Sequence, residues 1–191
     1  TKDLVIGYEE ALTKPLNLLL ERKQKICVIG ANVLGKTTLL KSLLGEIPPV
    51  SGIVEKGQNK LTGYFEQALS SENTKTCIED VWESFPSYTQ YEIRSALAKC
   101  GLTTAQLESK VYVLSGGEQA KVRLCKIINR ETNILVLDEP TNHLDVDAKN
   151  ELKRALIEYP GTILMVCHEP EFYGDIVSNI WNLADSTLKI V

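Results

Sequence analysis

One segment of this sequence has the residue types and spacing of a phosphate-binding loop. Gly30-Ala-Asn-Val-Leu-Gly35-Lys36-Thr37 fits G-x-x-x-x-G-K-[ST], with an apolar run before it and a helical pattern after it. Backbone N–H groups of such a loop, and of the helix that follows, point at phosphate oxygens. We expect Lys36 to reach the β and γ phosphates of a nucleotide, and the Thr37 hydroxyl to ligate Mg²⁺. The alternative is a Gly-rich turn that happens to precede a helix.

A pair of carboxylates follows a second apolar run. Residues 134–137 form an Ile-Leu-Val-Leu run that ends in Asp138 and Glu139. Open α/β sheets bind ligands at the carboxyl ends of their strands. We therefore expect Asp138 to hold the metal, usually through water, and Glu139 to polarise the water that attacks the γ-phosphate. An ordinary acidic exit from a strand is the alternative, and the phosphate loop argues against it.

A third segment places two glycines at the start of a helical pattern. In Leu114-Ser-Gly-Gly-Glu-Gln119, Ser115 and Glu118 have the spacing of a capping box. Capping does not explain Gly116 and Gly117, because a glycine inside a helix costs about 1 kcal/mol. Glycines at a helix N-terminus let a phosphate approach the backbone N–H groups closely. The segment therefore predicts a second phosphate-contacting surface.

Two further side chains stand at the ends of predicted elements. Asp145 precedes a helical pattern and is a candidate N-cap. His168 follows the apolar run 163–167, where it would contact the γ-phosphate or the attacking water. A structural role is the alternative for a lone histidine at a strand end.

The hydrophobic pattern places these motifs on the loops of an α/β fold. Strands alternate with helices, and a helical insert of about 76–130 separates the early strands from the late ones. The expected strands are 3–8, 16–20, 25–29, 52–56, 61–66, 133–137 and 162–167, and the expected helices are 36–44, 145–159 and one near 170–176, before a closing hairpin turned at 185–186.

Composition limits the class of protein. The 191 residues are 43% hydrophobic, a length and composition typical of one domain. The net charge of −4 disfavours bulk electrostatic binding of nucleic acid, although it does not exclude a local basic patch. The apolar runs are far shorter than the roughly 20 residues of a membrane span, so we expect no direct membrane insertion. Five scattered cysteines without a C-x-x-C pair favour a reducing, cytoplasmic setting.

Taken together, the motifs resemble those of an ATP-binding cassette (ABC) ATPase domain, a P-loop NTPase, over residues 1–191. The phosphate loop is similar to the Walker A motif, Asp138–Glu139 to the Walker B motif with its catalytic Glu, and Leu114–Gln119 to the signature motif. Asp145 is similar to the D-loop Asp, and His168 to the switch His. The resemblance implies a single domain with a mainly parallel core sheet, an antiparallel β subdomain and a small helical insert.

The resemblance also implies roles that the residues alone do not. Gln67 is similar to the Q-loop Gln, and Tyr8 to the aromatic residue that stacks on adenine; a plain Tyr at a strand end is the alternative. The implied catalytic residues are Glu139, His168 and Gln67, and the implied Mg²⁺ ligands are Thr37, Gln67 and Asp138. The implied ATP-binding residues are Tyr8, Gly30, Ala31, Asn32, Val33, Leu34, Gly35, Lys36, Thr37 and Thr38. Ser115, Gly116, Gly117 and Glu118 would contact the ATP of a second cassette.

Two segments are similar to the ABC-F branch, whose members are soluble tandem-cassette ATPases. These segments are Pro140-Thr-Asn-His-Leu-Asp145 and Tyr64-Phe-Glu-Gln67. The similarity implies the second, C-terminal cassette, excised from a tandem protein, that pairs head to tail with another cassette in the same chain or in a homodimer. Several members act on the ribosome in translation or antibiotic resistance, so a ribosomal partner is expected. The nucleotide-binding subunit of a membrane transporter is an alternative.

Val33 departs from the family pattern of the phosphate loop. The family sequence G-x-x-G-x-G-K has glycine where this chain has Val33. If that position requires a positive φ, a β-branched residue there costs on the order of 1–3 kcal/mol. We therefore expect ATP binding, and we keep a non-hydrolytic nucleotide-sensing module as an alternative to hydrolysis.

Overall fold

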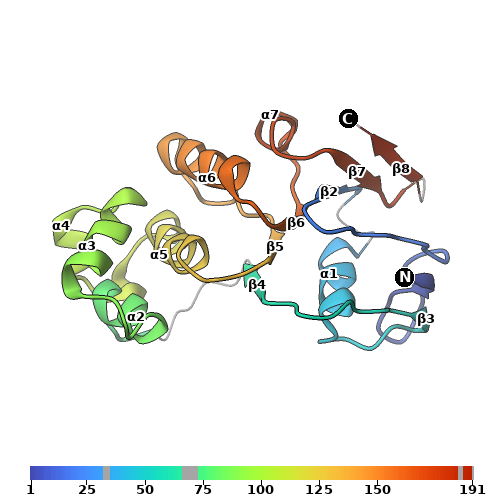
Figure 1. The fold of residues 1–191 in the computed structure, drawn as a ribbon, viewed down its shortest axis with the longest axis horizontal. Coiled ribbons are helices and arrows are strands. Elements are labelled where there is room, and N and C mark those ends of the chain that lie inside the picture. The colour runs from blue at the N-terminus through green and yellow to red at the C-terminus, as the bar shows by residue number, and fades with distance from the viewer. Residues whose placement is uncertain (32–34, 66–72, 185–186, 191) are drawn as a thin grey trace. The chain divides into compact units, whose positions relative to one another are not determined.

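The structure, a computed structural model, describes residues 1–191 apart from 32–34, 66–72, 185–186 and 191 (Figure 1). The chain forms two compact units. The first, here called the sheet unit, contains Thr1–Tyr64, Thr132–Pro140 and Pro160–Val191. The second, here called the helical unit, contains Phe65–Glu131 and Thr141–Tyr159. Each unit carries part of the predicted chemistry and is described by itself.

The sheet unit is built on a six-stranded sheet, in the order β4-β5-β6-β2-β7-β8. Strands β5, β6, β2 and β7 are parallel, and β8 returns antiparallel to β7. Strand β6 is buried along its whole length, as is usual for a parallel strand covered on both faces. The strands are β2 (Lys25–Ile29), β4 (Thr62–Phe65), β5 (Ile134–Asp138), β6 (Thr162–Val166), β7 (Asn179–Asn182) and β8 (Thr187–Ile190). This mainly parallel α/β sheet confirms the predicted fold class.

A small antiparallel sheet pairs β1 (Lys2–Val5) with β3 (Ser51–Ile53). The predicted strand 16–20 is wrong, because Leu16 forms only an isolated bridge with Leu4. The physical reason lies at Asp3, whose backbone N–H donates to the side-chain Oδ1 of Asn17 at 2.8 Å, while its φ is 47°. A side-chain acceptor thus replaces a backbone partner, and the ladder does not continue.

Helix α1 (Lys36–Leu44) follows the phosphate loop with the predicted bounds. It ends at Gly45, whose φ of 87° lies in the left-handed region that favours glycine at helix ends. Leu39 and Leu40 are fully buried in a core that also contains Val28 of β2 and Trp181 of β7. Burial of each such leucine contributes about 1.5–3 kcal/mol. The core therefore holds both elements that flank the loop.

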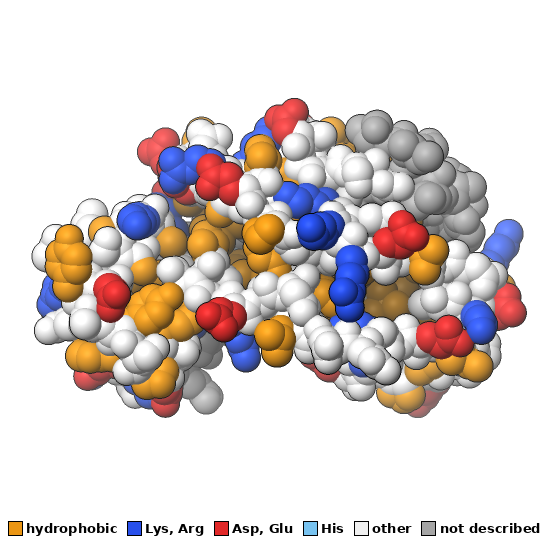
Figure 2. Space-filling model, viewed as in Figure 1, with side chains coloured by type: hydrophobic (Ala, Val, Ile, Leu, Met, Phe, Trp, Pro, Cys, Tyr) orange, Lys and Arg blue, Asp and Glu red, His pale blue; other side chains and the backbone are white. Residues whose placement is uncertain are grey.

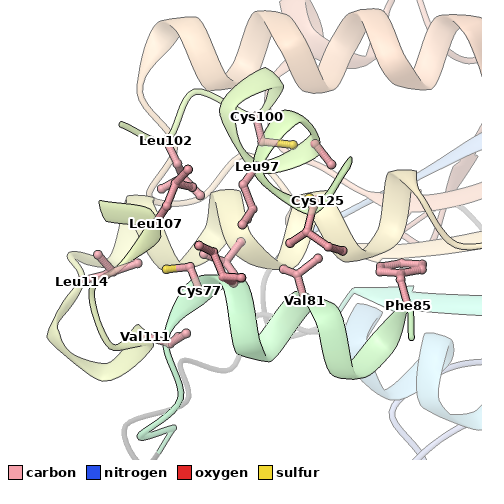
Figure 3. Packing of buried hydrophobic residues seen from close by; sticks show 14 residues of the cluster. Cys77, Val81, Phe85, Leu97, Cys100, Leu102, Leu107, Val111, Leu114 and Cys125 are labelled. Carbon is pink, nitrogen blue, oxygen red and sulfur yellow. The ribbon is translucent and has the colours of Figure 1, made fainter. Parts of the chain in front are cut away.

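The helical unit contains the predicted insert and one further helix. Four of its helices begin with a capping box, in which a Ser or Thr side chain and a Glu or Gln side chain satisfy each other's backbone N–H groups. The helices are α2 (Cys77–Ser84), α3 (Gln90–Lys99), α4 (Thr104–Leu107), the 3-10 turn η2 (Val111–Val113), α5 (Gly116–Ile128) and α6 (Val146–Glu158). Figure 3 shows the core shared by α2, α3, α4 and α5, in which Cys77 and Val81 of α2 lie near Leu97 of α3 and Cys125 of α5.

The remaining helix, the membrane criterion and the surface charge complete the description. Helix α7 (Pro170–Tyr173) is shorter than predicted. Among the described residues, no helix combines the length and the apolar character needed to cross a bilayer. On the face drawn in Figure 2, the described Lys and Arg side chains are interspersed with Asp and Glu, and no continuous basic surface forms there.

Candidate nucleotide site

The phosphate loop joins β2 to α1 in the sheet unit. Gly30 follows the last residue of β2, and Gly35 is the N-cap of α1, with φ of 72°. Side chains rarely adopt that φ, and a Cβ on Gly35 would lie 3.0 Å from Cδ1 of Leu12. Residues Asn32, Val33 and Leu34 lie outside the described residues, so the expectation for Val33 stays a prediction.

Lys36 is the first residue of α1, and it is buried with 4% exposure. Its Nζ donates to the carbonyl oxygens of Gly30 at 2.9 Å and Ala31 at 3.2 Å. Burial lowers the pKa of Lys36, while the nearby charges of Glu139 and Asp138 act in the opposite direction. Lys36 and the predicted pair of carboxylates therefore lie within electrostatic range of one another.

The two carboxylates are placed differently at the end of β5. Asp138 is the last residue of the strand and is only 2% exposed. Glu139 leaves the sheet with a φ of 47°, and its backbone N–H donates to the carbonyl oxygen of Val166 at 3.0 Å. Its Oε1 lies 3.3 Å from Nε2 of His168, which follows β6. The adjacent parallel strands thus bring Glu139 and His168 together.

The residues around the loop fit a Mg²⁺ ion bound with a nucleotide. Mg²⁺ prefers oxygen ligands and is usually held by one or two protein oxygens with substrate phosphates and waters. Thr37 presents a hydroxyl in the first turn of α1, and Asp138 presents a carboxylate whose charge acts on Lys36. The third predicted ligand, Gln67, lies outside the described residues.

Tyr8 is 70% exposed just after β1. The turn that presents it depends on Gly7, because a Cβ there would lie 2.0 Å from the carbonyl oxygen of Glu10. Gly7 also forms an isolated bridge with Ala11. The local backbone therefore holds the Tyr8 ring outward, and its stacking on adenine stays a prediction.

The signature segment begins α5 in the helical unit. The backbone N–H of Ser115 donates to Oε2 of Glu118 at 2.8 Å, and the N–H of Glu118 donates to Oγ of Ser115 at 3.4 Å. The bond from Ser115 is the main reason why the pKa of Glu118 is lowered, and Gln106 adds a further bond at 2.5 Å. Ser115 and Glu118 thus form the predicted capping box.

Two residues of the signature helix contact the loop between β5 and α6. A Cβ on Gly117 would lie 2.5 Å from the carbonyl oxygen of His143, so the loop approaches the helix backbone closely. Lys121 Nζ donates to Oδ2 of Asp145 at 2.7 Å. The same carboxylate caps α6 as predicted, because its Oδ1 accepts the N–H of Ala148 at 2.8 Å. The sequence interpretation missed Lys121, although a lysine on the apolar stripe of a helix is a signal.

The predicted site residues are therefore divided between the units. The sheet unit carries Tyr8, Gly30, Ala31, Gly35, Lys36, Thr37, Thr38, Asp138, Glu139 and His168. The helical unit carries Ser115, Gly116, Gly117, Glu118 and Asp145. Within the sheet unit, the structure brings the loop lysine, the carboxylates and the histidine together at the carboxyl ends of the strands, as the motifs predict.

Comparison with known proteins identifies the family. The family model described as ABC transporter matches residues 13–142. The uncharacterized ABC transporter ATP-binding protein YfmM of Bacillus subtilis is 67% identical over 191 residues, which is all of this chain and 37% of YfmM. ABC transporter F family member 2 of Arabidopsis thaliana is 40% identical over 191 residues, with 98% of this chain and 28% of that protein covered. The chain thus spans well under half the length of these relatives.

A solved structure shows the same fold. The ATP-binding cassette MJ0796, as a dimer in a post-hydrolysis state with ADP and Pi, has a TM-score of 0.81 and 20% sequence identity, and the match covers 99% of this chain and 97% of that one. The match covers residues of both the sheet unit and the helical unit. The chain therefore belongs to the ABC transporter family, and its relatives include a member of the F branch of that family.

Proposed function

We propose that this chain is an ATP-binding and ATP-hydrolysing cassette of a soluble ABC-F protein. The observation that carries the proposal is the 3.3 Å approach of Nε2 of His168 to Oε1 of Glu139, at the strand ends that also hold the phosphate loop. Glu139 would accept a proton from the attacking water and so polarise it. His168 would orient that carboxylate and contact the γ-phosphate.

Lys36 and the loop would bind the phosphates. The ammonium of Lys36 is buried against two loop carbonyls, and phosphate oxygens would be stronger, charged acceptors for it. Thr37 and Asp138 would hold Mg²⁺, and Gln67 is proposed as a further ligand and catalytic residue. The ion would neutralise negative charge that develops on the phosphates.

A complete site would need a second cassette, in the same full-length chain or in a homodimer. We propose a head-to-tail pair in which Ser115–Glu118 of one cassette caps the ATP on the phosphate loop of the other. The dimeric state of the MJ0796 cassette with ADP and Pi supports pairing of this kind. One chain would then supply half of each of two sites.

The proposed setting is the ribosome in the cytoplasm, with this chain as the second cassette of a tandem protein. Support comes from the segment Pro140–Asp145, from F-branch relatives and from five buried free cysteines. A transporter subunit is a weaker candidate, because that segment resembles the F branch. Val33 favours the non-hydrolytic alternative, which measurable turnover by a paired cassette would exclude.

The ribosomal proposal is tested in the full-length protein by Glu139→Gln, which keeps the shape of the side chain but removes the proton acceptor. We expect the variant to stay ATP-bound and to co-sediment with ribosomes in ATP, whereas the wild type dissociates. Glu131→Gln is a matched control, because Glu131 is exposed at the end of the helical insert. Equal sedimentation of both variants and the wild type would contradict ribosomal action.

A further inference from the structure

We propose that Lys121 is a positioning residue that fixes the loop Thr141–Asp145 to the signature helix α5, so that helix and loop move together during ATP turnover. The inference rests on the proposed ATPase function and adds a residue that the motifs do not include. All of the contacts that carry it lie within the helical unit.

The first observation is the environment of the Lys121 ammonium. Its side chain is 11% exposed, and its Nζ lies 2.7 Å from Oδ2 of Asp145. The same Nζ also donates to the carbonyl oxygen of Gly101, at the longer distance of 3.5 Å. A buried charge is costly unless it is paired and hydrogen-bonded. The Asp145 carboxylate therefore supplies the main compensation for placing a lysine on the inner side of α5.

The second observation is that the Asp145 carboxylate is held at both oxygens. Oδ2 accepts from Lys121, and Oδ1 accepts from the backbone N–H of Ala148 in the first turn of α6. The contact with Lys121 is the largest cause that lowers the pKa of Asp145, and the bond from Ala148 is the next. The carboxylate thus connects α5 to the start of α6.

The third observation is independent of charge. The carbonyl oxygen of His143 approaches Gly117 so closely that a Cβ there would lie 2.5 Å from it. His143 itself has a φ of 66°, and the N–H of Leu144 donates to the carbonyl oxygen of Thr141 at 3.2 Å. Gly117 and Lys121 are four residues apart and lie on one side of α5. The loop therefore contacts the same side of the helix at two successive turns.

The loop Thr141–Asp145 lies next to Glu139 in the sequence, so its contact with α5 can affect that residue. Only Pro140 separates Thr141 from Glu139 in the sequence, and proline restricts the backbone there. In this proposal, a displacement of α5 that keeps both contacts would carry the loop with it, and the loop is joined to Glu139 through Pro140 alone. Lys121 would thereby link the binding of the signature helix to ATP on a second cassette with the placement of the Glu139 carboxylate, which is proposed to polarise the attacking water.

The test compares two lysines of α5 in the full-length protein. Lys121→Met removes the contact to the loop, and Lys126→Met removes an ion pair of the same helix with Asp80 of α2, at 2.6 Å. We expect Lys121→Met to lower kcat about tenfold with KM for ATP nearly unchanged. Lys126→Met is expected to lower the melting temperature without lowering kcat. Lys121→Arg should restore most of the turnover.

A double-mutant cycle separates coupling from general damage. Asp145→Asn keeps an oxygen for the N–H of Ala148 but removes the charge that pairs with Lys121. The kcat of the double variant should be no lower than that of the worse single variant, because both changes break the same contact. Additive losses, or an unchanged kcat in Lys121→Met, would overturn the inference.

Hydrogen exchange tests the inference separately from the proposed function. In Lys121→Met, the amides of Leu144 and Ala148 should exchange faster than in the wild type, whereas in Lys126→Met they should not. If the wild type does not hydrolyse ATP, the proposed function fails, and the exchange result still decides the linkage. Unchanged exchange at both amides would overturn it.

Discussion

Oε1 of Glu139 lies 3.3 Å from Nε2 of His168, although 29 positions separate the two residues in the chain. The contact arises because β5 and β6 are adjacent parallel strands, with Asp138 in register with Val166. Glu139 follows β5 and His168 follows β6, so both residues lie at the same edge of the sheet. The backbone of Glu139 turns into the left-handed region at this point.

The backbone conformation of Glu139 predicts that the side chain needed for activity lowers the stability of the fold. A residue with a Cβ at a φ of 47° carries strain of about 1 kcal/mol relative to glycine. Glu139→Gly should therefore have a higher free energy of unfolding than Glu139→Ala by about that amount, while both variants lack the carboxylate. Urea denaturation of the two variants measures the difference. An alanine variant as stable as the glycine variant would show that the position is unstrained.

Gly117 provides a second stability prediction. Alanine normally favours a helix over glycine by about 1 kcal/mol. At Gly117, however, the added Cβ would lie 2.5 Å from the carbonyl oxygen of His143. Gly117→Ala should therefore lower the free energy of unfolding by about 1–3 kcal/mol, since the loop must move. Thermal denaturation checks this, and a melting temperature equal to or above that of the wild type would be inconsistent with the close approach.

The Lys121–Asp145 pair predicts a pH dependence with a definite sign. The pKa of Asp145 is lowered from its ordinary value of 3.8, first by Lys121 and then by the N–H of Ala148. A lowered carboxyl pKa stabilises the fold above the ordinary value, and this contribution is lost as pH falls toward the lower, folded-state value. The difference in melting temperature between the wild type and Lys121→Met should therefore shrink as pH is lowered through 3.8. A difference that stays constant through this range would count against the ion pair.

The phosphate loop could be predicted because its signals are local. An apolar strand, Gly35 and the leucine stripe of α1 are consecutive in the chain, and the capping box of Ser115 and Glu118 is also local. The motif order likewise placed Glu139 and His168 at strand ends, which is where the structure has them. Local pattern therefore predicted most of the sheet and the candidate residues on it.

What the sequence did not predict depends on contacts between distant residues. The expected strand 16–20 is absent because the side chain of Asn17 bonds to the backbone of Asp3. The contact of Lys121 with Asp145 spans 24 positions. The role of Gly117 likewise depends on a carbonyl from another loop. No periodicity or spacing rule reports such pairings.

The most direct test of the central claim is steady-state phosphate release by the full-length protein, compared with Glu139→Gln and the exposed control Glu131→Gln. If Glu139 polarises the attacking water, the Glu139→Gln variant should lose about 10²- to 10⁴-fold in kcat and still bind ATP. The control should match the wild type. Turnover in Glu139→Gln equal to that of the wild type would contradict the proposed role of Glu139.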